Sequence, residues 1–89
     1  MATLHERQKY RMQIMKTLYA AMEANRPAVT GAKLSDAIGI PEQDLATACT
    51  YLADEGMLLV DWTTHNTPAT VTLTHQGIRL MEAEEEGRG

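Results

Sequence analysis

The chain has 89 residues, 44% of them hydrophobic and 22% charged, and a formal net charge of −4. A chain of this length forms one small hydrophobic core, so we expect a single domain over residues 1–89, to whose stability a partner chain would add. One cysteine excludes an intramolecular disulfide, and no apolar run approaches the ~20 residues that span a bilayer, so we expect a cytoplasmic protein that does not bind membranes.

The charges are segregated along the chain. Residues 1–33 hold six basic and two acidic side chains, a net charge of +4, whereas residues 34–89 hold two basic and ten acidic ones, a net charge of −8. The field of the whole chain therefore repels a phosphate backbone, and any surface for nucleic acid has to be local.

The first predicted element is a helix over residues 4–25. Apolar side chains recur there at spacings of three and four without glycine or proline, and Arg26-Pro27 follows as the stop. Met12 and Tyr19 lie at the edge of the apolar stripe of a helix longer than its own core needs. We expect them to form the contact of a homodimer, and packing at the rim of the core is the alternative.

A second, shorter helix is predicted over residues 31–38. An extended segment at residues 28–29 precedes it, Thr30 is its expected cap, and Gly39 ends it. The apolar residues that predict this helix are Ala32, Leu34, Ala37 and Ile38.

The third predicted helix covers residues 41–54. Pro41 suits its first position because proline has a helical φ, and Gly56 follows as the residue that closes the helix. The inner face is expected to consist of Leu45, Ala48, Cys49 and Leu52. The outer face is expected to consist of Gln43, Thr47, Thr50, Tyr51 and Asp54.

A β-hairpin is predicted over residues 57–74. The apolar run 57–62 and the alternating run 70–74 are expected to pair across a polar loop at residues 63–69, and a last helix follows over residues 75–86 with Thr74 as its cap. Trp62 either packs against the hairpin or the first helix, or is an exposed anchor for a partner protein.

This order of elements resembles a winged helix-turn-helix domain. The stretch VTGAKLSDAIGIPEQDLATACTYLADEGMLL is similar to the helix-turn-helix of bacterial winged-helix regulators. The stretch TVTLTHQGIRLME resembles the LT-x-x-G sequence that leads from the wing into the last helix in MarR-like, PadR-like and HxlR-like proteins. The resemblance implies an α+β, mainly α fold, with a three-helix core, a β-hairpin wing and a C-terminal helix.

The same resemblance implies a transcriptional regulator that binds double-stranded DNA as a dimer. It makes residues 41–54 the recognition helix, residues 31–38 the supporting helix and residues 63–69 the wing, with Lys33 on the phosphate backbone. The other DNA-binding residues that it implies are Gln43, Thr47, Thr50, Tyr51, His65 and Asn66.

The third helix also departs from the DNA-binding pattern, because it has acidic side chains and no lysine or arginine. An alternative is therefore a winged-helix module that binds a protein partner through this acidic helix and does not contact DNA directly. Roughly 3–4 phosphate contacts for each protomer would give weak binding, so DNA binding is expected to need a dimer.

Other chemistry is not expected. His5, His65, His75 and Cys49 are scattered and do not form a metal-ligand pattern, and the glycines are single residues at the boundaries of elements. Cys49 has no neighbouring base that would make it a nucleophile. We therefore expect no enzyme activity, no metal and no cofactor.

Overall fold

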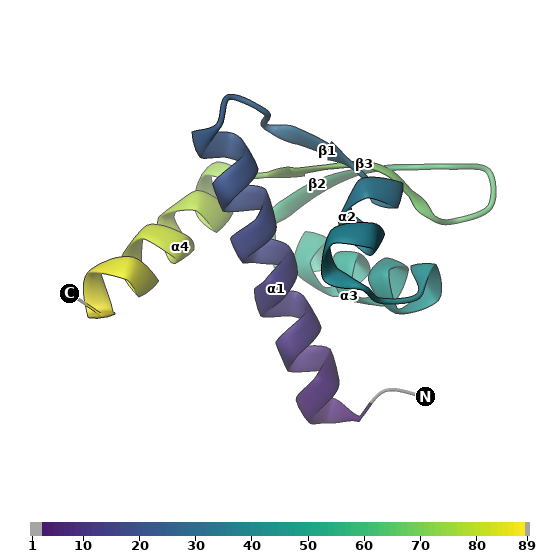
Figure 1. Cartoon of the computed structure of the whole chain (residues 1–89), viewed down its shortest axis with the longest axis horizontal. Helices are drawn as coiled ribbons and strands as arrows, with labels where there is room; N and C mark the ends of the chain where they lie inside the picture. The colour runs from purple at the N-terminus through teal and green to yellow at the C-terminus, as the bar shows by residue number, and fades with distance from the viewer. Residues whose placement is uncertain (1–2, 89) are drawn as a thin grey trace.

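The computed structural model describes residues 3–88, with the backbone alone for residues 85–88. This part of the chain forms four helices and one three-stranded antiparallel sheet, so the predicted α+β, mainly helical class is confirmed (Figure 1). The elements in chain order are α1 (Leu4–Glu23), β1 (Ala28–Thr30), α2 (Gly31–Ile38), α3 (Glu42–Asp54), β2 (Leu58–Trp62), β3 (Pro68–Leu73) and α4 (His75–Arg88).

Helix α1 begins with reciprocal hydrogen bonds between Thr3 and Glu6. The backbone N–H of Glu6 donates to the Thr3 hydroxyl at 3.1 Å, and that of Thr3 donates to the Glu6 carboxylate at 3.2 Å. The bond from the Thr3 backbone, followed by the bond from its hydroxyl, lowers the pKa of Glu6. The predicted end at residue 25 is wrong: the helix ends at Glu23, because Asn25 has a left-handed φ of 63°, which asparagine tolerates.

Helix α2 has the predicted cap and the predicted end. The Thr30 hydroxyl accepts from the backbone N–H of Lys33 at 3.2 Å, and Gly39 is left-handed with a φ of 76°. Of the four apolar residues that predict this helix, Ala32 and Ala37 are exposed. The inward face of α2 consists of Gly31, Leu34 and Ile38, and at 100° for each residue the two alanines lie off that face.

Helix α3 begins one residue later than predicted. Pro41 is its N-cap, because its ψ of 150° is extended although its φ of −62° is helical. The carbonyl of Pro41 accepts the first helical bond, from the backbone N–H of Leu45 at 3.0 Å. Gly56, with a φ of 79°, follows the helix as predicted.

The sheet has the strand order β1-β3-β2, so its central strand is the last of the three in the chain. The predicted pairing of the two hairpin strands is confirmed, but the pairing of β1 with β3 was not predicted. The predicted hairpin bounds 57–74 are too wide, and the loop is residues 63–67 and not 63–69. Pro68 already belongs to β3, where it lies opposite Trp62 beside an irregular register in β2.

Two close contacts join the hairpin to its neighbours. A Cβ on Gly31 would overlap the carbonyl oxygen of Pro68, so only glycine lets α2 begin against β3. The Thr74 hydroxyl donates to the Gly56 carbonyl at 2.6 Å and accepts from the Gly77 backbone N–H at 3.2 Å, which confirms Thr74 as the cap of α4. Helix α4 continues to Arg88, beyond the predicted end at residue 86.

One hydrophobic core joins the helices to the sheet. It confirms the predicted inner face of α3 and takes further residues from α1, α2, both hairpin strands and α4. Its buried residues are Ile14, Met15, Leu18, Leu34, Ile40, Leu45, Ala48, Cys49, Leu52, Leu58, Val71, Leu73 and Met81.

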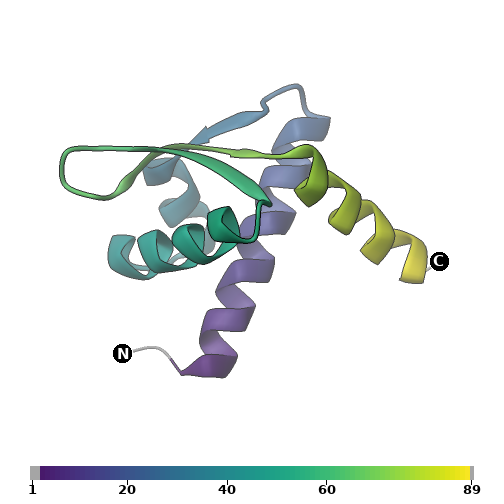
Figure 2. The ribbon, with the colours of Figure 1, turned by 180° about the vertical axis from the view of Figure 1, so that it is seen from behind.

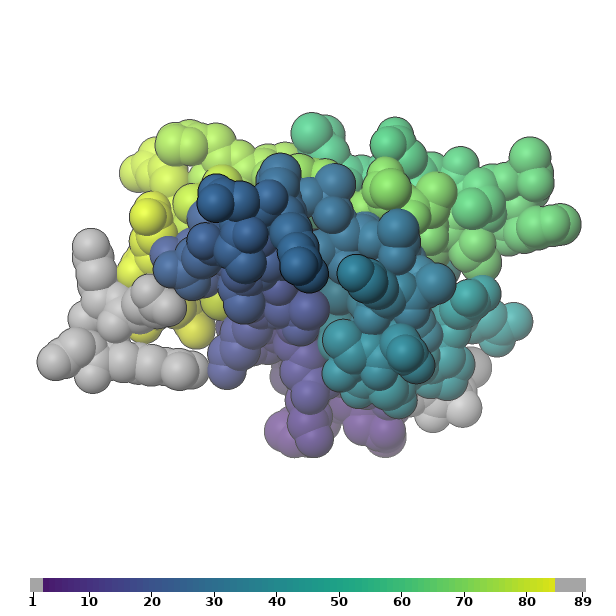
Figure 3. All heavy atoms as spheres, turned by 45° about the horizontal axis from the view of Figure 1, so that its top comes forward, coloured from purple at the N-terminus to yellow at the C-terminus, as the bar shows by residue number. Residues whose placement is uncertain are grey.

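Helix α1 lies at the centre of the molecule. Figure 1 and Figure 2 show α3 on one side of it and α4 on the other, and α1 packs against both. Figure 3 shows the β2–β3 loop projecting at the end of the molecule opposite α4. Among residues 3–88, none of the helices combines the length and the apolar character that crossing a bilayer requires.

Candidate functional site

The outer face of α3 is polar and exposed. Gln43, Thr47, Thr50 and Asp54 follow one another at spacings of three and four, and all four are exposed. The Thr47 hydroxyl donates to the Gln43 carbonyl at 3.0 Å, and the Thr50 hydroxyl donates to the Ala46 carbonyl at 2.9 Å. Two grooves flank this face, and Thr47 lines both of them.

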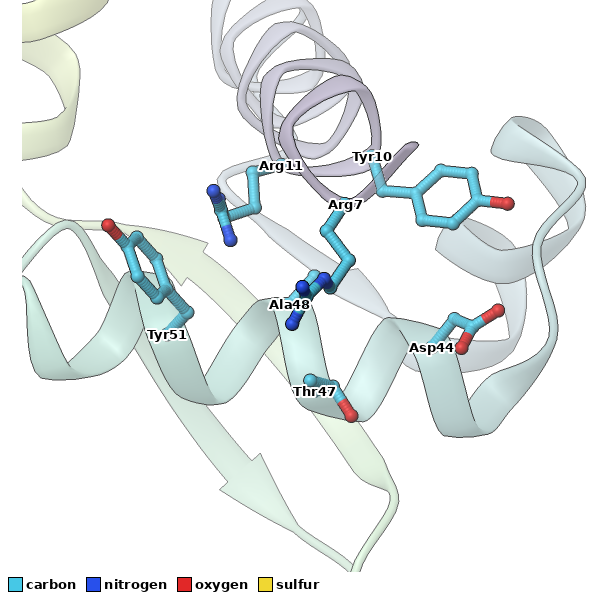
Figure 4. Close-up of a pocket in the computed structure, with 7 residues that line it drawn as sticks. All are labelled: Arg7, Tyr10, Arg11, Asp44, Thr47, Ala48 and Tyr51. Carbon is cyan, nitrogen blue, oxygen red and sulfur yellow. The ribbon is translucent and has the colours of Figure 1, made fainter. Parts of the chain in front are cut away.

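The first groove lies between α3 and the N-terminal half of α1 (Figure 4), and we call it the arginine groove. Its volume is about 300 Å³. The Arg11 guanidinium carbon lies 3.9 Å from the centre of the Tyr51 ring, a cation–π distance, and 48% of Tyr51 is exposed. The residues that line it are Arg7, Tyr10, Arg11, Asp44, Thr47, Ala48 and Tyr51.

Charge in the arginine groove is positive on balance. Arg7 and Arg11 are four residues apart, so both project from the same face of α1 toward α3. Asp44, in the first turn of α3, supplies one negative charge. The arginines thus give α3 the basic neighbours that its own sequence lacks.

The second groove lies between α3 and the β2–β3 loop, and we call it the tryptophan groove. It has a volume of about 340 Å³ and is lined by Ala46, Thr47, Thr50, Trp62 and Asn66. Trp62 is 43% exposed. Its role as an anchor for a partner protein stays a prediction.

Internal hydrogen bonds fix the conformation of the β2–β3 loop. The backbone N–H of Thr63 donates to the Thr67 carbonyl at 2.9 Å, and the hydroxyls of the same two residues are 2.8 Å apart. The backbone N–H of His65 donates to the Thr63 hydroxyl at 3.2 Å. Asn66 has a left-handed φ of 61°, which asparagine tolerates, and its side chain reaches the tryptophan groove.

The structure brings together part of the predicted site. Thr47, Thr50, Tyr51 and Asn66 line the two grooves, and Gln43 is exposed on the same face of α3, one turn before Thr47. His65 is exposed in the loop.

Lys33 lies elsewhere, in a groove among α1, β1 and α2 that it shares with Arg26 and Thr17. It lines neither groove beside α3, so the side chain expected on the phosphate backbone lies away from the exposed face of that helix. Arg7 and Arg11, which line the arginine groove, were not among the residues named from the sequence. Their spacing of four was a signal that they share a face, but no local pattern shows which element that face meets.

The two residues expected at a dimer contact, Met12 and Tyr19, are half-buried and pack against the core. This placement agrees with rim packing, and the homodimer stays a prediction.

Cys49 is fully buried, and this burial raises the pKa of its thiol to about 11. At neutral pH the thiol is therefore protonated and is not a nucleophile. Across the part of the chain that the structure describes, no three side chains of His, Cys, Asp or Glu gather closely enough to hold a metal ion.

No known protein family, no curated protein and no solved structure matches this chain.

Proposed function

We propose that the chain is a winged helix-turn-helix domain that binds double-stranded DNA and acts as a transcriptional regulator. The order of elements supports the fold, because a hairpin follows the third helix and its loop stands beside that helix. In this proposal α3 is the recognition helix and the loop at residues 63–67 is the wing.

The observation that carries the proposal is the arginine groove. A helix that enters the major groove needs basic side chains at its flank to hold the phosphates, and α3 has none of its own. Arg7 and Arg11 supply two such groups from α1, next to the exposed face that carries Thr47. The tryptophan groove, with Asn66, forms the opposite flank of the same face.

Binding by one protomer rests on few charges. Two arginines correspond to about two phosphate contacts, which give weak and salt-sensitive affinity. A dimer that sets two recognition helices about one turn of the duplex apart doubles these contacts, so we propose that the protein acts as a dimer.

The test is duplex binding measured by fluorescence anisotropy at about 20 mM and about 150 mM salt. The double variant Arg7→Gln/Arg11→Gln is expected to weaken binding and to reduce the slope of log K against log salt by about 2 for each bound protomer. The matched control is Lys9→Gln/Lys16→Gln, which removes the same charge from exposed positions of α1 outside the groove.

The control is expected to retain most of the affinity. If the wild type shows no salt-dependent binding at about 20 mM salt, the proposed function is wrong. If both double variants lose affinity equally, DNA binding stands but the arginine groove is not its phosphate site.

A further inference from the structure

Two threonines on the outer face of α3 donate their hydroxyl hydrogens to backbone carbonyls of the same helix. A hydroxyl has one hydrogen to donate, and in Thr47 and Thr50 it goes to the backbone carbonyls of Gln43 and Ala46, at 3.0 and 2.9 Å. What these side chains offer to a ligand is a methyl group and the remaining lone pairs of the oxygen. The centre of the face therefore lacks hydrogen-bond donors.

The neighbouring residues extend the apolar character of this surface. Ala46 adds a third methyl group to the tryptophan groove, and the exposed indole of Trp62 forms its opposite wall. The lining residues whose side chains carry free donor types, Trp62 and Asn66, belong to the hairpin and not to the helix.

The base pairs differ in how well their major-groove edges fit a surface that lacks donors. In the major groove guanine presents two acceptors, N7 and O6, which need donors, whereas thymine presents a methyl group beside its acceptor. Guanine pressed against Thr47 and Thr50 would lose hydrogen bonds to water without replacement, which costs free energy. A thymine methyl group that packs against a threonine methyl group loses no hydrogen bond to water.

We infer that α3 recognises the 5-methyl groups of thymine through Thr47 and Thr50, and so selects A·T base pairs at its centre. This inference rests on the proposed DNA-binding function. Gln43 is exposed on the same face one turn earlier and carries the side-chain amide that pairs with adenine, so it extends the same preference.

The test begins with selection of bound duplexes from a randomised library, which is expected to give sites with A·T pairs at the centre of each half-site. Each thymine of the selected site is then replaced by deoxyuridine, which keeps the hydrogen-bonding groups and removes the methyl group. The wild type is expected to lose about fourfold in affinity for each contacted methyl.

The variant Thr47→Ser/Thr50→Ser keeps both hydroxyls and removes both protein methyl groups. It is expected to bind the thymine and deoxyuridine duplexes with nearly equal affinity. The matched control Thr17→Ser removes a threonine methyl from α1 in the groove that holds Lys33, and it is expected to keep the discrimination of the wild type.

Three results would overturn the inference while leaving DNA binding in place: equal affinity of the wild type for both duplexes, selected sites with guanine at the centre, or unchanged discrimination in the double serine variant. Absence of salt-dependent binding to every duplex would instead overturn the proposed function, and the inference with it.

Discussion

Cys49 shows how a residue with reactive chemistry is made inert by its position. It lies on the inner face of α3 with no exposed surface, and burial raises the pKa of its thiol from 9.0 to about 11. The neutral thiol is therefore the form that the folded protein favours, which links stability to pH.

The pKa of Cys49 is higher in the folded protein than in the unfolded chain. The contribution of the buried thiol to stability is therefore complete below about pH 9 and is lost as the pH rises toward 11. We expect the free energy of unfolding of the wild type to fall by about 2 kcal/mol more than that of Cys49→Ala between pH 8 and pH 10.5. Urea unfolding of both proteins at several pH values measures this difference. Parallel pH profiles would show that the thiol does not carry the effect.

The sequence predicts the helical part of the candidate site from the period of one helix, and the winged-helix resemblance supplies the loop residue Asn66. The period of α3 was sufficient to place Thr47 and Thr50 outward and Cys49 inward, because the direction of a helical side chain is local geometry. The contribution of Arg7 could not be predicted in this way. It depends on how α1 packs across α3, which no local pattern encodes.

Among the elements, α2 and the hairpin meet at a close backbone contact. Gly31, the first residue of α2, lies against the carbonyl of Pro68, the first residue of β3. Because β3 begins where the loop ends, this contact fixes the position of the end of the loop relative to α2.

Gly31→Ala is expected to lower the free energy of unfolding by about 1–3 kcal/mol, because the added methyl group overlaps backbone atoms that cannot rotate away. Urea unfolding measures the loss. Ala32→Ser, at the exposed neighbouring position, is the control and is expected to change stability by less than about 0.5 kcal/mol. Wild-type stability in Gly31→Ala would mean that the hairpin shifts without cost.

Most elements were predictable, and their ends were less so. The caps Thr30 and Thr74 are short-range signals and were identified correctly. The left-handed Asn25 and the extended ψ of Pro41 were not identified, because each residue also fits a helix. The strand β1 was seen only as an extended segment, since its partner lies far away in the sequence.

At the scale of the whole molecule, basic side chains of α1 meet the acidic helix α3 in the arginine groove. The arginine groove is on the side of α1 that faces α3. Helix α4, with the acidic Glu82 and Glu84, lies on the opposite side of α1 (Figures 1 and 2). The net charge of −4 therefore does not describe the field at α3. Groups within about one Debye length, ~8–10 Å, dominate there.

Asp44→Asn and Glu82→Gln remove the same charge from different places. We expect Asp44→Asn to raise duplex affinity about 2–5-fold, since Asp44 lies in the groove proposed to receive phosphate, and Glu82→Gln to change it little. Anisotropy titrations at about 50 mM salt measure both. Thermal melting should accompany them, because Asp44 also stabilises the first turn of α3.

The sign of the Asp44 effect separates the two functions. A basic protein partner that docks on an acidic α3 would bind Asp44→Asn more weakly, whereas a duplex would bind it more tightly. Weaker duplex binding by a variant that melts like the wild type would contradict the position of the phosphate in the arginine groove.

The strand order β1-β3-β2 has a consequence for synthesis on the ribosome. Every strand pair in the described part of the chain includes β3, so β1 and β2 have no partner in each other. A nascent chain that has emerged only as far as Trp62 can form helices but no sheet, and the docking of α2 against Pro68 has to wait as well. Assembly of the sheet thus follows the synthesis of α1, α2 and α3 and waits for the six residues of β3.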